Sequence, residues 1–206
     1  MFYLFFLLAL LLAAALFSTV FKEGALRLLA KGFRIFVVCI SLLIFTYFFV
    51  TRSLTPHAEN ALTVMVVNKL PFPLDFYLIK QSNTESGNEY ETRHLGNIRN
   101  EFYRIDYLNM EKADQFWIVA YMGQKNLVYF SQHAVPNKNE DQIIEVQNYI
   151  NQSVKLSEIS KNLIADLKFE SMKTAIWITL DLLLLFLNIA LLFRKSTKKI
   201  PTVAGF

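Results

Sequence analysis

Asp181 is the residue of this chain best placed to do chemistry, because it lies near the middle of an apolar run of twenty residues, Thr174–Phe193. On insertion scales, a charged side chain at the centre of a membrane-spanning helix costs about 2.5–3.5 kcal/mol. Asp181 must therefore be protonated, paired, or turned toward water or protein. Thr174, Trp177, Asp181 and Asn188 share one stripe at helical spacing. This polar stripe is expected to face protein and not lipid.

Two kinds of chemistry suit the polar stripe. One is a proton or cation path through Asp181, and the other is interhelical hydrogen bonding by Asp181 and Asn188 that holds an assembly together. A proton path needs further ionisable groups at membrane depth, whereas the other apolar runs supply hydroxyls and one thiol, among them Ser41 and Cys39. Hydrogen bonding is therefore favoured. An ion path would need its other half from a different subunit.

Other residues with reactive side chains are scattered along the sequence. His57, His94 and His133 lack the spacing and the acidic neighbours of metal ligands. Cys39 is the single cysteine and lies in an apolar run, where a thiol stays protonated. The sequence contains no motif of a serine hydrolase, zinc protease, nucleotide-binding loop or dithiol site. These observations predict no catalytic residue, no metal and no cofactor, in a protein that is not an enzyme.

Three apolar segments must position these side chains. Apolar residues make up 54% and charged residues 18% of the 206-residue chain, whereas soluble domains average about 45–50% and about 25%. Met1–Phe21 carries no charge, Gly32–Thr51 holds only Arg34, and Thr174–Phe193 holds only Asp181. Each segment has the length of a helix that crosses the roughly 30 Å hydrocarbon layer. Because no Lys or Arg precedes the first run, a retained helix is favoured over a cleaved signal peptide.

Basic residues set the expected orientation, because Lys and Arg in short flanking segments are retained on the cytoplasmic side. The linker at 22–34 and the tail at 194–206 are both basic and are separated by two crossings, so both are expected in the cytoplasm. The N-terminus is then outside, and aromatic residues gather at the predicted outer helix ends. The residues that determine this topology are Lys22, Arg27, Lys31, Arg34, Arg194, Lys195, Lys198 and Lys199.

Segment 52–152 changes to an alternating pattern and is expected outside the cytoplasm. Six runs rich in β-branched and aromatic residues predict strands, with a weaker seventh at 90–95. Strands at short, regular spacing favour a small antiparallel sandwich of immunoglobulin-like type. Its expected core includes Phe76, Phe116, Trp117 and Tyr129. The six runs are 62–68, 74–80, 101–108, 115–122, 126–132 and 142–149.

Segment 153–173 has helical periodicity, with one apolar and one charged face. Leu156, Ile159, Leu163, Ile164 and Leu167 form the apolar face, which is expected to pack on the β-domain in preference to a partner. No Gly or Pro lies between this segment and Phe193. One continuous helix, serving as a stalk, is therefore expected to join the third apolar run.

The predicted fold class is a membrane protein of α+β type. It combines three transmembrane helices with an extracytoplasmic, immunoglobulin-like β-sandwich and an amphipathic stalk helix. The expected parts are an N-terminal helix hairpin at 1–51, a β-domain at 52–152, the stalk at 153–173, a third membrane helix at 174–193 and a basic cytoplasmic tail at 194–206.

These parts predict a function of anchoring and not of catalysis. We expect a subunit of a bacterial inner membrane that holds its β-domain outside as a docking or scaffolding surface within a larger membrane complex. Its partners would be the lipid bilayer and other membrane or envelope proteins, or a second copy of itself, with no nucleic acid. One alternative is an accessory subunit of a channel, motor or transporter with Asp181 in a coupling site. The other is an extracytoplasmic ligand sensor.

Overall fold

The computed structural model describes residues 2–20, 24–53, 61–84, 87–138 and 140–193. The chain divides into two compact units, Met1–Leu54 with Ser171–Phe206 (unit 1) and Thr55–Glu170 (unit 2). Unit 1 is helical and unit 2 contains two small β-sheets, so the architecture is α+β. The helix α3 (Val154–Phe193) begins in unit 2 and ends in unit 1.

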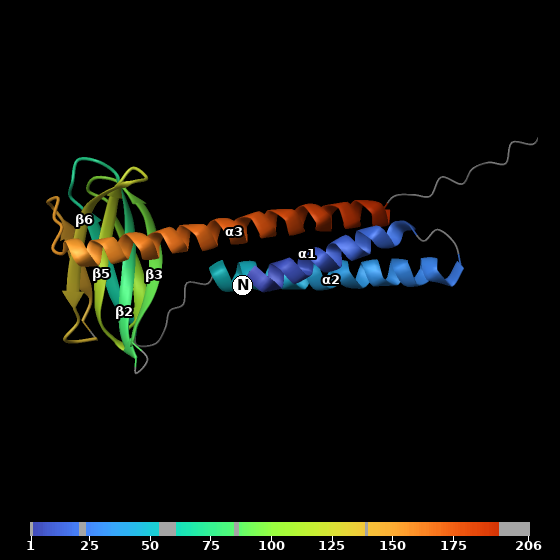
Figure 1. Ribbon diagram of the computed structural model, residues 1–206, viewed down its shortest axis with the longest axis horizontal. Coiled ribbons are helices and arrows are strands. Elements are labelled where there is room, and N and C mark those ends of the chain that lie inside the picture. Colours follow the sequence, from blue (N-terminus) through green and yellow to red (C-terminus); the bar gives the residue numbers. More distant parts are fainter. Residues whose placement is uncertain (1, 21–23, 54–60, 85–86, 139, 194–206) are drawn as a thin grey trace, which may run out of the picture. The chain divides into compact units, whose positions relative to one another are not determined.

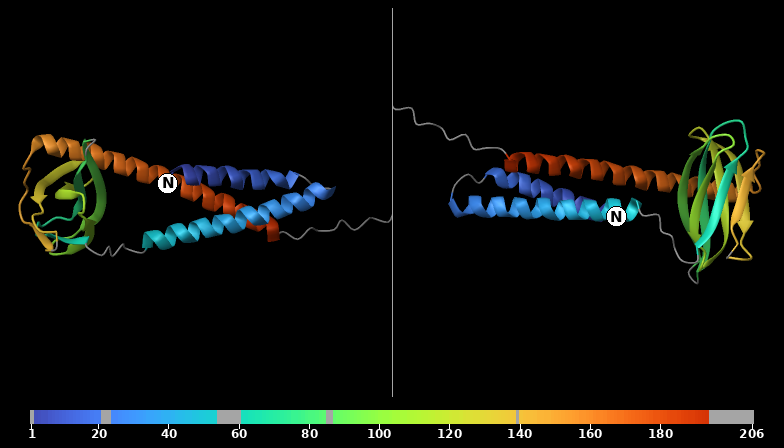
Figure 2. Two further views of the ribbon diagram at one scale, coloured as in Figure 1. Left: turned by 90° about the horizontal axis from the view of Figure 1, so that it is seen from below. Right: turned by 180° about the vertical axis from the view of Figure 1, so that it is seen from behind.

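Unit 1 contains α1 (Phe2–Phe17), a 3-10 turn η1 (Ser18–Val20), α2 (Gly24–Ser53) and the C-terminal part of α3. The ring of Phe5 meets that of Phe48 at 5.1 Å, and the ring of Phe6 meets that of Trp177 at 5.2 Å. These contacts join the start of α1 to the end of α2 and to α3. Helix α1 is therefore antiparallel to α2 and parallel to α3, as Figure 2 shows.

The three helices of unit 1 bury a shared apolar cluster and leave many other large apolar side chains uncovered. Leu43, Leu183 and Phe186 are 57–70% exposed. Among the helices that the structure describes, α2 and α3 are long and apolar enough to cross a membrane. The buried cluster consists of Phe5, Leu8, Leu12, Ala15, Val37, Val38, Phe45, Phe48 and Leu185.

Two helix boundaries differ from those expected from the sequence. A helix was expected through residue 21, but α1 ends at Phe17 and spans about 24 Å, short of the hydrocarbon thickness. The Ser18 hydroxyl donates to the carbonyl of Ala15 at 2.6 Å, a local bond that competes with a regular helix. The linker expected at 22–34 is largely helical, because strong helix formers extend α2 back to Gly24.

Among the described residues of unit 2 there are seven strands, one at each of the six predicted runs and one at the weaker seventh. The runs 101–108 and 142–149 are strands only from Tyr103 and only to Val146. A three-stranded sheet has the order β4-β1-β7. A four-stranded sheet has the order β3-β2-β5-β6, and its strands are labelled in Figure 1. The strands are β1 (Ala61–Asn68), β2 (Leu74–Thr84), β3 (Gly87–Ile98), β4 (Tyr103–Asn109), β5 (Ala113–Met122), β6 (Asn126–Ala134) and β7 (Gln142–Val146).

The two sheets share one apolar core. Alternate residues of β1, such as Val64 and Val66, pack with residues of β2 and β5 in the same buried cluster. Phe76, Phe116 and Tyr129 lie in this cluster, which confirms their prediction as core residues. The residues that alternate along the predicted strands are thus the ones through which the two sheets pack on each other.

The strand connectivity corrects the expectation of an immunoglobulin-like antiparallel sandwich. In an immunoglobulin constant domain the second strand pairs with the first and the fifth. Here β2 pairs with β3 and β5, while β1 pairs antiparallel with β4 and parallel with β7. After β6 the chain passes to the other sheet and joins β1 in the same direction. Alternation within a strand carries no information on such long-range pairing.

The start of α3 covers the outer face of the four-stranded sheet. The Ser153 hydroxyl accepts a hydrogen bond from the Leu156 backbone nitrogen at 3.3 Å and caps the helix. The side chains of Leu156, Ile159, Leu163, Ile164 and Leu167 pack with Trp117, Tyr77 and Phe130 of the sheet. The predicted packing of the amphipathic segment on the β-domain is therefore confirmed. Trp117 is buried as expected, but in this second cluster.

Candidate functional site

The polar stripe of α3 is covered by helices of the same chain. Asn188 is fully buried, and its Nδ2 donates to the carbonyl of Leu12 in α1 at 3.0 Å and to that of Leu184 at 2.9 Å. Asn188 Oδ1 has no hydrogen-bond partner among the described residues. The amide therefore links α3 to α1 inside the bundle, and its stripe is not a free surface.

The guanidinium of Arg34 in α2 contacts the end of α1. Its residue is only 9% exposed, and its Nε donates to the carbonyl of Ala15 at 3.3 Å. Ala15 belongs to the last turn of α1, where carbonyl groups lack helical partners and carry partial negative charge. Arg34 and Asn188 thus hold α1 from two different helices. A lone cation inside an apolar run was the only sequence signal of this role.

Asp181 is fully buried within unit 1, on the same face of α3 as Asn188 and about 10 Å along the helix from it. Its neighbours Trp177 and Leu185 pack in the apolar cluster of the bundle. Neither carboxylate oxygen has a hydrogen-bond partner among the described residues. A buried polar group without such a bond costs free energy, so Asp181 lowers the stability of the bundle.

The remaining members of the stripe lie toward the end of the bundle at which aromatic side chains meet. Trp177 is half-buried and contacts the ring of Phe6 edge-on. Thr174 is half-buried one turn earlier on α3. Ser41, on α2, is fully buried and donates to the carbonyl of Val37 in its own helix at 2.7 Å. The bundle therefore buries three of the predicted polar side chains, Ser41, Asp181 and Asn188, and each has different hydrogen bonding.

The structure describes the side chains of only some of the residues that were predicted to determine the topology. Among the topology determinants, Lys31 is exposed on α2 and Arg34 is buried as described. Arg27 lies in α2, and its side chain is outside the described set. The residues Lys22, Arg194, Lys195, Lys198 and Lys199, together with His57, lie outside the described residues.

A second candidate site is the outer face of the three-stranded sheet. Met65 of β1 is paired with Ile105 of β4 and with Ile143 of β7, so three apolar side chains form a row across the sheet. Ile105 is 45% and Ile143 is 62% exposed. Tyr103, on the same face of β4, is 58% exposed. We name Met65, Tyr103, Ile105 and Ile143 the apolar sheet face.

Sequence alternation marks two faces of β4 but could not reveal that Tyr103 and Ile105 lie on the exposed one. The buried side of β4 carries Leu108 together with charged residues. Asp106 on that side lies 3.6 Å from Arg93, whose Nη1 also donates to the Tyr107 carbonyl at 2.9 Å. Paired charges thus occupy the face toward the core, and apolar side chains occupy the face toward solvent. A period of two cannot reveal this reversal.

Comparisons with known proteins give no family for this chain. No protein-family model and no curated protein matches it. One similar solved structure is that of a disulfide-locked mutant of intermedilysin with human CD59, at 12% sequence identity and a TM-score of 0.26. The similarity covers 41% of this chain and only 21% of that chain. A likeness of this size carries no argument on fold or function.

Proposed function

We propose that the protein is a non-enzymatic membrane subunit that presents unit 2 as a docking surface for another protein subunit outside the cytoplasm. In this proposal α1 extended by η1, α2 and the end of α3 cross a bacterial inner membrane, with the N-terminus outside and the C-terminus inside. The three residues of η1 add about 6 Å to α1 and bring it to about 30 Å. Support comes from the uncovered apolar side chains of the helices and from the up-and-down order in which the three helices pack.

The apolar sheet face is the observation that carries the docking role. The outer face of the four-stranded sheet is covered by α3, whereas the outer face of the three-stranded sheet leaves Ile105 and Ile143 about half exposed. Contiguous apolar side chains on a water-facing surface mark sites of protein association. Tyr and Met beside branched aliphatic residues have the composition of an interface core. The partner is accordingly a protein that offers an apolar surface in return.

The bundle suits the role of a fixed anchor. Its three helices share one apolar cluster, and α1 receives hydrogen bonds from both Arg34 and Asn188. Because Asn188 and Asp181 are enclosed by the helices of their own chain, the polar stripe holds the subunit together internally. We therefore propose that unit 2, and not the helical bundle, recognises the partner.

Photocrosslinking in cells tests this proposal. A photoreactive amino acid at Ile143 is expected to give a specific adduct with another protein, and the same amino acid at Ile105 is expected to give the same adduct. Gln124, exposed in the turn between β5 and β6, is the matched control and is expected to give none. Equal adducts from Ile143 and Gln124, or none from Ile143 and Ile105, would contradict the docking role.

A second candidate function is favoured by the buried carboxyl group of Asp181. This function is that of an accessory subunit of a channel, motor or transporter in which Asp181 takes part in ion coupling. The two carboxylate oxygens lack partners among the described residues, as a site reserved for a proton or ion would. Asp181→Asn keeps the size and removes the titratable proton. If this variant assembles and the complex transports normally, the coupling role is excluded.

A further inference from the structure

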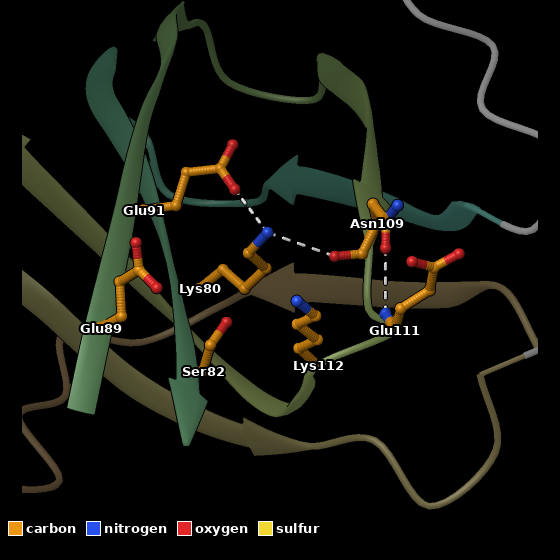
Figure 3. A pocket seen from close by; sticks show the side chains of 7 residues that line it. All are labelled: Lys80, Ser82, Glu89, Glu91, Asn109, Glu111 and Lys112. Carbon is orange, nitrogen blue, oxygen red and sulfur yellow. Dashed lines mark hydrogen bonds and ion pairs between the residues drawn. The ribbon is translucent and has the colours of Figure 1, made fainter. Parts of the chain in front are cut away.

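Unit 2 holds a polar pocket of about 330 Å³, separate from the apolar sheet face. Its walls come from β2 and β3 on one side and from the turn between β4 and β5 on the other (Figure 3). The volume lies at the small end of the range for small-molecule sites. The pocket is lined by Lys80, Ser82, Glu89, Glu91, Asn109, Glu111 and Lys112.

Lys80 and Glu91 form the inner part of this pocket and satisfy each other. The Lys80 side chain is only 14% exposed, pairs with Glu91 and donates to the Asn109 carbonyl at 3.2 Å. Glu91 also accepts two hydrogen bonds from Arg93, at 2.7 and 2.8 Å. Burial would raise the pKa of Glu91, but the bonds from Lys80 and Arg93 outweigh it and lower that pKa. The charges of Lys80 and Glu91 are therefore paired within the pocket wall, and we do not assign them to ligand binding.

The turn between β4 and β5 is fixed before any ligand arrives. Asn109 Oδ1 accepts a hydrogen bond from the Glu111 backbone nitrogen at 2.9 Å. Met110 and Ala113, which flank the exposed pair Glu111 and Lys112, are each 1% exposed in the apolar core. The two charged side chains thus project from a turn that is anchored on both sides. Preorganisation of this kind reduces the entropic cost of binding.

Four polar groups in the pocket have no side-chain partner among the described residues. Glu89 and Glu111 lie on opposite sides in Figure 3, with the Lys112 ammonium and the Ser82 hydroxyl between them. Ser82 is nine-tenths buried, yet its hydroxyl makes no hydrogen bond with the part of the chain that is described. Among the described residues, the pocket therefore offers two carboxylates, one cation and one hydroxyl that have no side-chain partner.

We propose that this pocket binds a small zwitterion of the amino-acid type. The Glu111 carboxylate takes the ligand's ammonium group, Lys112 with the Ser82 hydroxyl takes its carboxylate, and the Glu89 carboxylate across the pocket attracts the ammonium group at longer range. A ligand with only one sign of charge would leave the opposite charge of the pocket unpaired, whereas hydrogen bonds between charged groups are the strong ones. The polar lining excludes an apolar ligand. This inference goes beyond the docking role and does not depend on it.

Three related probes test the proposal: L-alanine, ethylamine, which is L-alanine without its carboxylate, and propionate, which is L-alanine without its ammonium group. Binding of each to the full chain in detergent is measured by equilibrium dialysis with radiolabelled probe. L-Alanine is expected to bind saturably and about tenfold more tightly than ethylamine, with propionate weaker still. Ethylamine binding as tightly as L-alanine, or no saturable binding of L-alanine, would overturn the proposal.

Variants of the exposed side chains identify the site. Lys112→Gln is expected to weaken L-alanine about tenfold, to the level of ethylamine, and to leave ethylamine unchanged. Glu89→Gln and Glu111→Gln are each expected to weaken both amines. Lys125→Gln, exposed in the turn between β5 and β6, is the matched control and is expected to change nothing. Unchanged L-alanine binding in Lys112→Gln, or an equal loss in Lys125→Gln, would place the binding elsewhere and refute the assignment.

Discussion

Asn188 of α3 donates a hydrogen bond to the backbone carbonyl of Leu12 in α1 across 3.0 Å, although the two residues are 176 positions apart. Both residues are fully buried. Three residues further along α1, Arg34 of α2 donates to Ala15. Polar groups from two helices therefore converge on the carbonyls of a third. In an apolar surrounding such bonds fix which faces of the helices meet.

Replacing Asn188 by Ala removes the bond to Leu12 and is expected to lower the free energy of unfolding of the bundle by roughly 1 kcal/mol. Reversible unfolding of the full chain in mixed micelles measures this change. Thr179→Ala is the control, because the exposed Thr179 hydroxyl donates only to Ala175 in its own helix. Equal losses in the two variants would show that the link to Leu12 contributes nothing.

Replacing Asp181 by Leu is expected to leave the bundle as stable as before or more stable. The change exchanges a buried carboxyl group without hydrogen-bond partners among the described residues for an apolar side chain of similar size. The same unfolding measurement applies. A loss of more than about 2 kcal/mol would mean that the carboxyl group has a bonding partner that the described residues do not supply.

Lys168 lies over two aromatic rings of the four-stranded sheet, with its Nζ 5.2 Å from the centre of Tyr77 and 5.3 Å from that of Tyr121. Lys168→Met keeps the aliphatic stem and removes the cation, so the packing of α3 on the sheet is expected to weaken by about 0.5–1 kcal/mol. Faster amide hydrogen exchange in residues 156–167 would report this change.

The control for this variant is Lys161→Met, which removes an exposed ion pair with Glu158. Ion pairs between residues three or four apart on a helix typically contribute about 0.2–0.5 kcal/mol, so exchange in α3 is expected to change less than in Lys168→Met. If the two lysine variants accelerate exchange equally, the contacts with Tyr77 and Tyr121 do not stabilise the helix.

His133 should make the stability of unit 2 depend on pH. Burial of its ring, which stacks on Phe116 at 5.3 Å, lowers its pKa below the ordinary value of 6.5. The unfolded chain then binds a proton more readily than the folded one. The contribution of neutral His133 to the free energy of unfolding of unit 2 is expected to be fully present above pH 6.5. It is lost as the pH falls through the lowered pKa. Urea titrations at several pH values should show this slope, and His133→Gln should flatten it.

The strands and the amphipathic face of α3 could be read from the sequence because each is a local pattern. Alternation from Leu62 to Val66 marks core residues whatever the partner strand is. Spacing of three and four from Leu156 to Leu167 likewise marks one helix face. Such patterns depend on the geometry of a single element, and they survive in the folded chain.

The features that sequence reasoning missed depend on pairings between distant segments. The parallel pairing of Met65 with Ile143 is set by where the chain goes after β6, not by the residues of either strand. The contact of Arg34 with Ala15 arises only once α1 and α2 lie antiparallel. The pocket lined by Lys80 and Lys112 needs both sheets in place. None of these three long-range contacts produces a periodic pattern of residues in the sequence.

The central claim is that unit 2 lies outside the cytoplasm on a chain that crosses the membrane. Cysteine labelling tests it most directly. In a Cys39→Ser background, which removes the only native thiol, Gln124→Cys in unit 2 and Lys31→Cys in α2 each place one exposed thiol. We expect a membrane-impermeant maleimide to label Gln124→Cys in intact cells and to label Lys31→Cys only after permeabilisation. The reverse pattern, or labelling of both variants in intact cells, would contradict the account.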